Sequence, residues 1–202
     1  MTAKGLRARQ AEATRELLVA TARDVFTERG YAATSIDGIV QRAGVAKGSL
    51  YHHFDGKEAI FRAVYESVEA EAIAGVMTAA LAAREPWTAV RAGLAAFLDA
   101  CLQPSFRRIV VLDSISVLQH QALEHGFESN ELPMLRTVIT PLVAAELLPG
   151  VGMEPLAHDA LGGLYGAALY IARAGQPEAA RVEIDAVLDV IVDGLQGATG
   201  AR

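Results

Sequence analysis

The sequence predicts an all-α protein, with a small N-terminal domain of three helices that contains a helix-turn-helix and a larger helical domain after it. Apolar residues recur every three or four positions along most of the chain, which places them on one face of a helix. Glycine and proline stand where these patterns stop, and no lasting polar–apolar alternation indicates a strand. Because the chain is 52% hydrophobic and 21% charged, it can form a substantial core.

The first helix is expected over residues 11–28. Leu18, Ala22 and Phe26 are spaced four residues apart and form one apolar stripe. The preceding residues 1–10 contain three basic side chains and no apolar periodicity. They predict a flexible basic arm that contacts the DNA backbone or minor groove, with a merely solvated tail as the alternative.

The next two helices form the helix-turn-helix. Thr34 is suited to cap the first of them, and Gly44 to end it in the left-handed conformation. A second short helix follows from Lys47 to Phe54, with Leu50 and Phe54 four residues apart on its inner side. In such a motif the second helix enters the major groove of double-stranded DNA.

The exposed side of this second helix carries groups that can contact phosphates and base edges: a cation, a hydroxyl, a phenol and an imidazole. Helix N-termini nearby attract phosphates in addition. We therefore expect DNA contacts from Thr34, Ser35, Lys47, Gly48, Ser49, Tyr51, His52 and Lys57.

The charge distribution supports a local DNA-binding region. The whole chain has a net charge of −6, but residues 1–62 hold ten Lys/Arg and seven Asp/Glu, which gives +3, so residues 63–202 carry −9. Salt limits the range of electrostatic interactions to about 8 Å. A basic end can therefore bind DNA although the protein as a whole is acidic.

The stretch GVAKGSLYHHFDGKEAIF, behind a first helix that ends ERGYAATSI, resembles the DNA-binding domain of the TetR family of transcriptional regulators. The resemblance is specific from about Ala13 to Val64 and looser beyond. It implies a homodimer in which the last two helices of each subunit form a four-helix bundle, and a helical body that binds an effector. Ala46, where the family usually has a capping serine, and Gly38 within the first motif helix depart from the pattern.

The remainder of the chain predicts a helical body with breaks at proline and glycine. Small residues in one of the last two helices and an apolar stripe in the other favour pairing with a second subunit, with packing inside one chain as the alternative. The expected helices run over about residues 57–83, 86–103, 105–120 (one helix or two), 135–148, 154–174 and 177–196, with a bent or loose connection at 121–132.

The middle helices contain more apolar side chains than a small core needs, with a few polar groups that could orient a bound molecule. This composition predicts a pocket for a small, mostly apolar effector, although each residue taken singly is better explained as an ordinary core or surface residue. The candidate ligand-binding residues are Trp87, Phe97, Cys101, Phe106, Asp113, His120, Met134 and Tyr165.

Catalytic and metal-binding spacings are missing from the sequence. His52 and His53 are adjacent, so on a helix their rings point about 100° apart, and Cys101 lies on an apolar helix side. We therefore expect a protein that is not an enzyme and has no metal or cofactor. A single cysteine, no secretory leader and no apolar span predict a cytoplasmic location.

Together, the residues and the resemblance predict a ligand-responsive transcriptional repressor that a small apolar molecule releases from a near-palindromic operator. The alternative is a small-molecule binding protein with a vestigial DNA-binding domain, supported by Ala46, Gly38 and the acidic total charge. The expected divisions are an arm at 1–10, the helix-turn-helix domain at 11–56, and a ligand-binding and dimerisation domain at 57–202.

Overall fold

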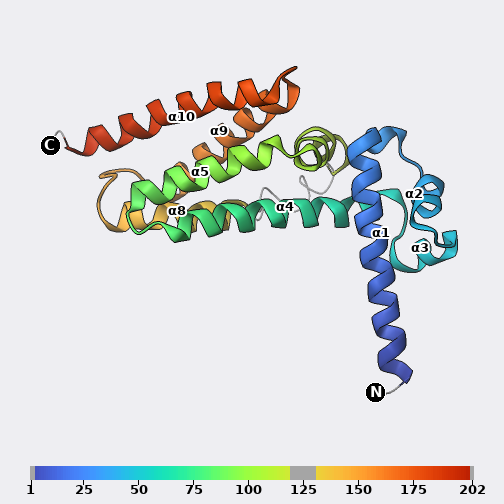
Figure 1. The fold of residues 1–202 in the computed structure, drawn as a ribbon. Coiled ribbons are helices and arrows are strands. Elements are labelled where there is room, and N and C mark those ends of the chain that lie inside the picture. Colours follow the sequence, from blue (N-terminus) through green and yellow to red (C-terminus); the bar gives the residue numbers. More distant parts are fainter. Residues whose placement is uncertain (1–2, 119–130, 201–202) are drawn as a thin grey trace.

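A computed structural model describes residues 3–118 and 131–200. Within these ranges the chain is helical and contains no strand, which confirms the predicted fold class. Figure 1 shows a small unit of three helices, α1 to α3, standing across one end of a longer bundle that begins with α4. Each helix in the described ranges is too short or too polar to span a bilayer.

The first helix, α1, spans Ala3–Ala33 and is interrupted at Gly30, where φ is 75° and ψ is 169°. Residues 3–10, predicted as an arm, are thus part of α1. The stretch consists largely of alanine, lysine, arginine, leucine and glutamine, which favour the helix. Residues 8–10 are exposed, so they pack against nothing that would require apolar side chains at helical spacing. The sequence therefore carries no periodic pattern that would have predicted a helix there.

Two short helices, α2 (Ile36–Ala43) and α3 (Lys47–His53), complete the N-terminal unit. Its core is made by fully buried side chains from all three helices, among them Phe26, Ile39 and Leu50. The third helix ends one residue earlier than predicted because Phe54 is extended (φ −140°, ψ 129°) while its amide still donates to the Leu50 carbonyl.

Helix α4, Lys57–Ala82, belongs to both parts of the molecule. At its N-terminal end the ring of Phe61 lies edge-on to Phe26 and Tyr31, with centroids 5.1 and 5.0 Å away. Further along, Val76 and Ala80 are buried in the body. A single continuous helix therefore joins the N-terminal unit to the helical body (Figure 1).

The body has irregular helices in its middle and long ones at its end. Helix α8 begins and ends four residues before the predicted 135–148, and Pro141 lies inside it. The expected connection at 121–132, apart from its last two residues, and candidate residue His120 lie outside the described ranges. The elements are α5 (Pro86–Leu102), the π-helix η1 (Phe106–Asp113), α6 (Ser114–Val117), α8 (Glu131–Ala144), α9 (Met153–Arg173) and α10 (Pro177–Gly200).

Candidate nucleic-acid interface and ligand cavities

The turn between α2 and α3 has the backbone geometry that the sequence predicted. Gly44 has φ 67° and ψ 28°, and its amide and that of Val45 donate to carbonyls of the last turn of α2. A glycine tolerates this left-handed conformation without steric cost. Ala46 begins α3 without a side-chain cap, as expected from its methyl side chain.

The cap of α2 is Ser35 and not Thr34, which corrects the prediction. The Ser35 hydroxyl accepts a hydrogen bond from the Gly38 amide at 3.1 Å. Thr34 is only 3% exposed, and its hydroxyl donates to the Gly30 carbonyl at 2.7 Å. Its side chain is therefore unavailable to a phosphate, whereas Ser35 is exposed.

Lys57 was predicted to contact phosphate, but the structure gives it an internal role. Its ammonium donates to the carbonyls of Tyr31 and Thr34, both at 2.9 Å, and lies 4.2 Å from the centroid of the Tyr31 ring. These contacts attach the start of α4 to the link between α1 and α2. Lys57 therefore positions the helix-turn-helix on the body.

We expect Lys57→Met to lower the free energy of unfolding by about 1.5–3 kcal/mol, because two part-buried hydrogen bonds from a charged group to backbone carbonyls are lost. The measurement is urea unfolding followed by circular dichroism. Lys47→Met is the matched control: its ammonium pairs with Asp37 at 2.8 Å, but both side chains are more than half exposed, so the loss should stay below about 1 kcal/mol. Lys47→Met serves as the control for stability alone, because Lys47 is itself an expected DNA contact. If Lys57→Met were as stable as Lys47→Met and still bound DNA more weakly than the wild type, Lys57 would have to contact phosphate after all.

The remaining predicted DNA-contacting residues lie on or beside α3. Tyr51 is 51% exposed, and Lys47, Gly48 and His52 are exposed, while Ser49 is half-buried. The hydrogen bond that the Lys47 ammonium donates to Asp37 raises the pKa of Lys47, so this lysine remains a cation. Apart from the adjoining backbone of α3, no heavy atom of the described residues lies within 4 Å of a Cβ built on Gly48, which leaves room for close approach of a DNA backbone.

The N-terminal unit is attached to η1 by a polar contact that sequence reasoning missed. A carboxylate oxygen of Asp113 accepts from the Tyr31 amide at 2.8 Å and from the Arg108 side chain at 3.1 Å. Asp113 was predicted to bind the ligand; it instead joins η1 to the end of α1. Tyr31 and Asp113 are 82 residues apart in the sequence, so no local sequence pattern predicts their contact.

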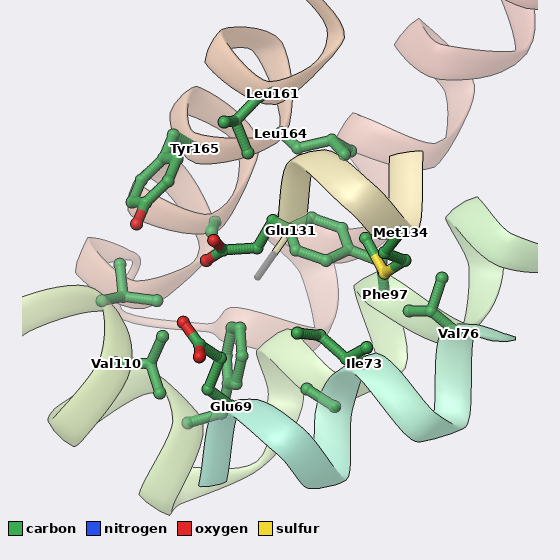
Figure 2. Close-up of a pocket in the computed structure, with 14 residues that line it drawn as sticks. Glu69, Ile73, Val76, Phe97, Val110, Glu131, Met134, Leu161, Leu164 and Tyr165 are labelled. Atoms are coloured by element: carbon green, nitrogen blue, oxygen red, sulfur yellow. The ribbon is translucent and has the colours of Figure 1, made fainter. Parts of the chain in front are cut away.

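Two adjoining cavities occupy the body. The first, which we call the acidic cavity, lies between α4, α5, η1, α8 and α9 and has a volume of about 50 Å³. Predicted residues Phe97, Phe106, Met134 and Tyr165 line it. Figure 2 shows this cavity with Glu69 and Glu131 among its walls.

The second, which we call the apolar cavity, has a volume of about 220 Å³ and extends to α10. Predicted residue Trp87 lines it, and Phe97 and Met134 line both cavities. Dry apolar cavities of about 150 Å³ hold a benzene-sized molecule. The apolar cavity is therefore large enough for a small organic ligand.

Cys101, another predicted ligand residue, lines neither cavity. Its side chain is fully buried in the main core, where burial raises the pKa of the thiol to about 12. It acts as a small apolar core residue, which corrects the prediction.

Glu69 was not predicted, although it is 4% exposed and lines the acidic cavity. It accepts a hydrogen bond from the Tyr65 hydroxyl at 2.5 Å, and burial together with this bond raises the pKa of Tyr65. Helix α4 contains several other glutamates. Only the packing of neighbouring helices distinguishes the buried one, so the sequence carried no clear signal.

Comparison with known proteins agrees with this architecture. Residues 18–64 match the tetR family of bacterial regulatory proteins, and residues 87–195 match the tetracyclin repressor-like C-terminal domain. The chain is 30% identical to the HTH-type transcriptional regulator SrpR of Pseudomonas putida, in a match that covers 63% of this chain and 67% of SrpR. It is 36% identical to the HTH-type transcriptional activator FasR of Mycolicibacterium smegmatis, in a match that covers 48% of this chain and 43% of FasR.

Among solved structures, a TetR-family transcriptional regulator from Pectobacterium atrosepticum superimposes with a TM-score of 0.79 and 32% identity. The match covers 93% of this chain and 96% of that one. The two domain matches together extend over most of the described residues. The chain therefore belongs to the TetR family of transcriptional regulators, whose members bind DNA.

Proposed function

We propose that the protein is a ligand-responsive repressor that binds a near-palindromic operator as a homodimer and leaves it when a small molecule enters the body. The observation that carries this proposal is the double role of η1. Its Phe106, Val110 and Val111 line the acidic cavity, while Asp113 accepts from the Tyr31 amide and Arg108 lies against Gly30, both at the end of α1. A ligand that moves η1 would thereby move the DNA-binding unit.

The thermodynamic consequence is reciprocal. An occupied cavity would favour an orientation in which the two α3 helices of a dimer no longer match successive major grooves. The ligand then lowers the affinity for DNA, and DNA lowers the affinity for the ligand by the same factor. Helix α4 carries the same movement, because it lines the cavity through Glu69 and Ile73 and holds the helix-turn-helix through Lys57.

The exposed face of α9 and α10 supports dimerisation through these helices. On α10, Val187, Val190 and Ile191 are 53%, 72% and 51% exposed. On α9, Gly162 and Gly166 are exposed, and beyond the backbone of α9 itself no heavy atom of the described residues lies within 4 Å of a Cβ built on either, so another helix can approach closely. Figure 1 shows α10 along the outer edge of the body, where a second subunit has access.

The first experiment selects duplexes from a randomised pool and titrates the enriched sequence by fluorescence anisotropy at two salt concentrations. Tight binding to a near-palindromic site, with affinity that falls steeply with salt, is the expected result. No enrichment would favour the alternative, a small-molecule binding protein with a vestigial DNA-binding domain. A second experiment measures transcription from a promoter with the selected site placed either upstream of it or over it. The result distinguishes repression from activation, which is the activity named for the relative FasR.

We expect Tyr51→Ala to weaken operator binding by roughly tenfold to hundredfold per half-site, since a base or phosphate contact contributes about 1–3 kcal/mol. The half-exposed side chain leaves the fold and the dimer intact, which urea unfolding and light scattering check. Tyr51→Phe separates the hydroxyl from the ring. Unchanged affinity in Tyr51→Ala would exclude a direct contact from this residue.

A further inference from the structure

The apolar cavity has its opening between α9 and α10. Most of the described residues that line it, Trp87 among them, are buried or half-buried. The exposed lining residues all belong to these two helices: Asp159 and Gly163 on α9, and Ile191 and Leu195 on α10. A molecule in the cavity therefore meets solvent only along this side.

This opening lies on the face that we propose for dimerisation. On α10, Ile191 lines the cavity, is 51% exposed and follows Val187 by four residues. On α9, Gly163 lines the cavity, and Gly166 of the proposed dimer face follows it by three residues. Residues three or four apart are neighbours on one side of a helix. A second subunit that packs on α9 and α10 therefore covers the opening.

The lining of the cavity favours a neutral, apolar ligand. Among the described lining residues the charged side chain is Asp159, which is exposed at the opening, and none is lysine, arginine or histidine. An ion deep in the cavity would lose its hydration without gaining a charged partner, which is costly. Since a cavity of about 150 Å³ holds benzene, one of about 220 Å³ has room in proportion for roughly nine non-hydrogen atoms.

We propose that the second subunit closes the apolar cavity over a compact, neutral ligand of the alkylbenzene class, so that ligand and dimer stabilise each other. This inference rests on the proposed function, because it uses the same dimer face. In a single chain the ligand leaves part of its apolar surface in water beside Ile191 and Leu195. In the dimer this surface is buried, which favours binding. Linkage then requires that the ligand strengthens dimerisation.

Three probes of nearly the same shape test the ligand class: isopropylbenzene, 1-phenylethanol and 1-phenylethylammonium, which differ in one methyl, hydroxyl or ammonium group. Trp87 is the only tryptophan of the chain and lines the cavity, so its fluorescence reports binding, and calorimetry gives the affinity independently. We expect isopropylbenzene to bind at least roughly tenfold tighter than the alcohol and hundredfold tighter than the cation. Equal or tighter binding of either polar probe, or no binding of isopropylbenzene, overturns the proposal.

Two variants that fill the cavity locate the probe. Ala160→Phe and Val138→Phe place a ring in it from α9 and α8, and each should weaken isopropylbenzene by roughly tenfold or more. The control is Ala74→Phe, at an exposed position of α4 that lines neither cavity, which should change nothing. Urea unfolding identifies the variants that fold. Wild-type affinity in a folded cavity variant contradicts the assignment.

Closure by the second subunit is tested with a monomeric variant. The double variant Val187→Asp with Val190→Asp alters the dimer face, but neither valine lines the cavity. Isopropylbenzene should bind this variant roughly tenfold more weakly than the wild-type dimer. Because a dimer has two cavities, saturation should lower the dimer dissociation constant of the wild type by up to about a hundredfold, as sedimentation velocity measures. Leu81→Asp, exposed on α4, should behave as wild type.

Two results overturn the closure: equal affinity of monomer and dimer for isopropylbenzene, or a double variant that stays dimeric through another surface. Operator release, measured by anisotropy on the selected duplex, separates this proposal from the broader one. If isopropylbenzene prefers the dimer but the operator stays bound, the closure stands and the regulatory function fails. If isopropylbenzene releases the operator but binds monomer and dimer equally, regulation stands and the closure is excluded.

Discussion

Gly30→Ala is expected to lower the free energy of unfolding by about 3 kcal/mol or more. Gly30 has φ 75° and ψ 169°, a combination that is essentially restricted to glycine and costs other residues about 1–3 kcal/mol. A Cβ at this position would also lie 1.7 Å from a guanidinium nitrogen of Arg108 and 2.4 Å from its central carbon. The Arg108 side chain would have to leave its position beside Asp113.

Urea unfolding of wild type and variant measures this loss, and Gly75→Ala supplies the control. Gly75 is exposed inside α4, and within the part of the chain that the structure describes only the backbone of α4 lies within 4 Å of its built Cβ. Alanine there should stabilise the protein by up to about 1 kcal/mol because it favours the helix. A Gly30→Ala variant as stable as wild type would mean that the end of α1 rearranges readily, and that its contact with η1 is not fixed.

The double variant Gly30→Ala with Arg108→Ala divides the effect into its two parts. Removing the guanidinium relieves the steric overlap and leaves the backbone strain, so it should restore only part of the lost stability. It also removes the Arg108 contact with Asp113. If η1 communicates with the DNA-binding unit through this contact, Arg108→Ala alone should reduce the effect of ligand on operator affinity.

Local rules predicted most helix boundaries because the signals lie within a few residues of each boundary. Pro86 and Pro177 begin α5 and α10, and Gly44 ends α2 in a left-handed conformation. Thr34 and Ser35 show the limit of these rules. Both residues can cap a helix, and the structure selects Ser35 because the bend at Gly30 directs the Thr34 hydroxyl to a carbonyl of α1.

The candidate cavities were only partly predictable. Aromatic and sulfur-containing side chains in the middle helices indicated apolar space, and Phe97 and Met134 do line both cavities. The positions of Glu69 and Asp113 depend on contacts between segments far apart in the chain. A glutamate on an amphipathic helix looks solvent-exposed in sequence, but the packing of η1 and α8 against α4 encloses Glu69 in the cavity.

The double variant Val187→Asp with Val190→Asp is expected to dissociate the proposed dimer and to abolish operator binding. The two valines are 53% and 72% exposed and lie three residues apart on one face of α10. In a two-fold symmetric interface each substitution occurs twice, so four carboxylates would be buried in an apolar surface. Each such charge costs several kcal/mol, so dimerisation should weaken by about a thousandfold or more.

Sedimentation velocity at micromolar concentration measures the mass of the variant, and anisotropy measures operator binding. A monomer has one α3 helix, so it loses the contribution of the second half-site to the operator affinity. Its circular dichroism should remain that of the folded protein, because both valines are exposed in the single chain. Leu81→Asp is the matched control, since Leu81 is 70% exposed but lies on α4. If the α10 variant remained a dimer that binds the operator, another surface would have to form the interface, and the spacing of the two α3 helices would depend on that surface instead.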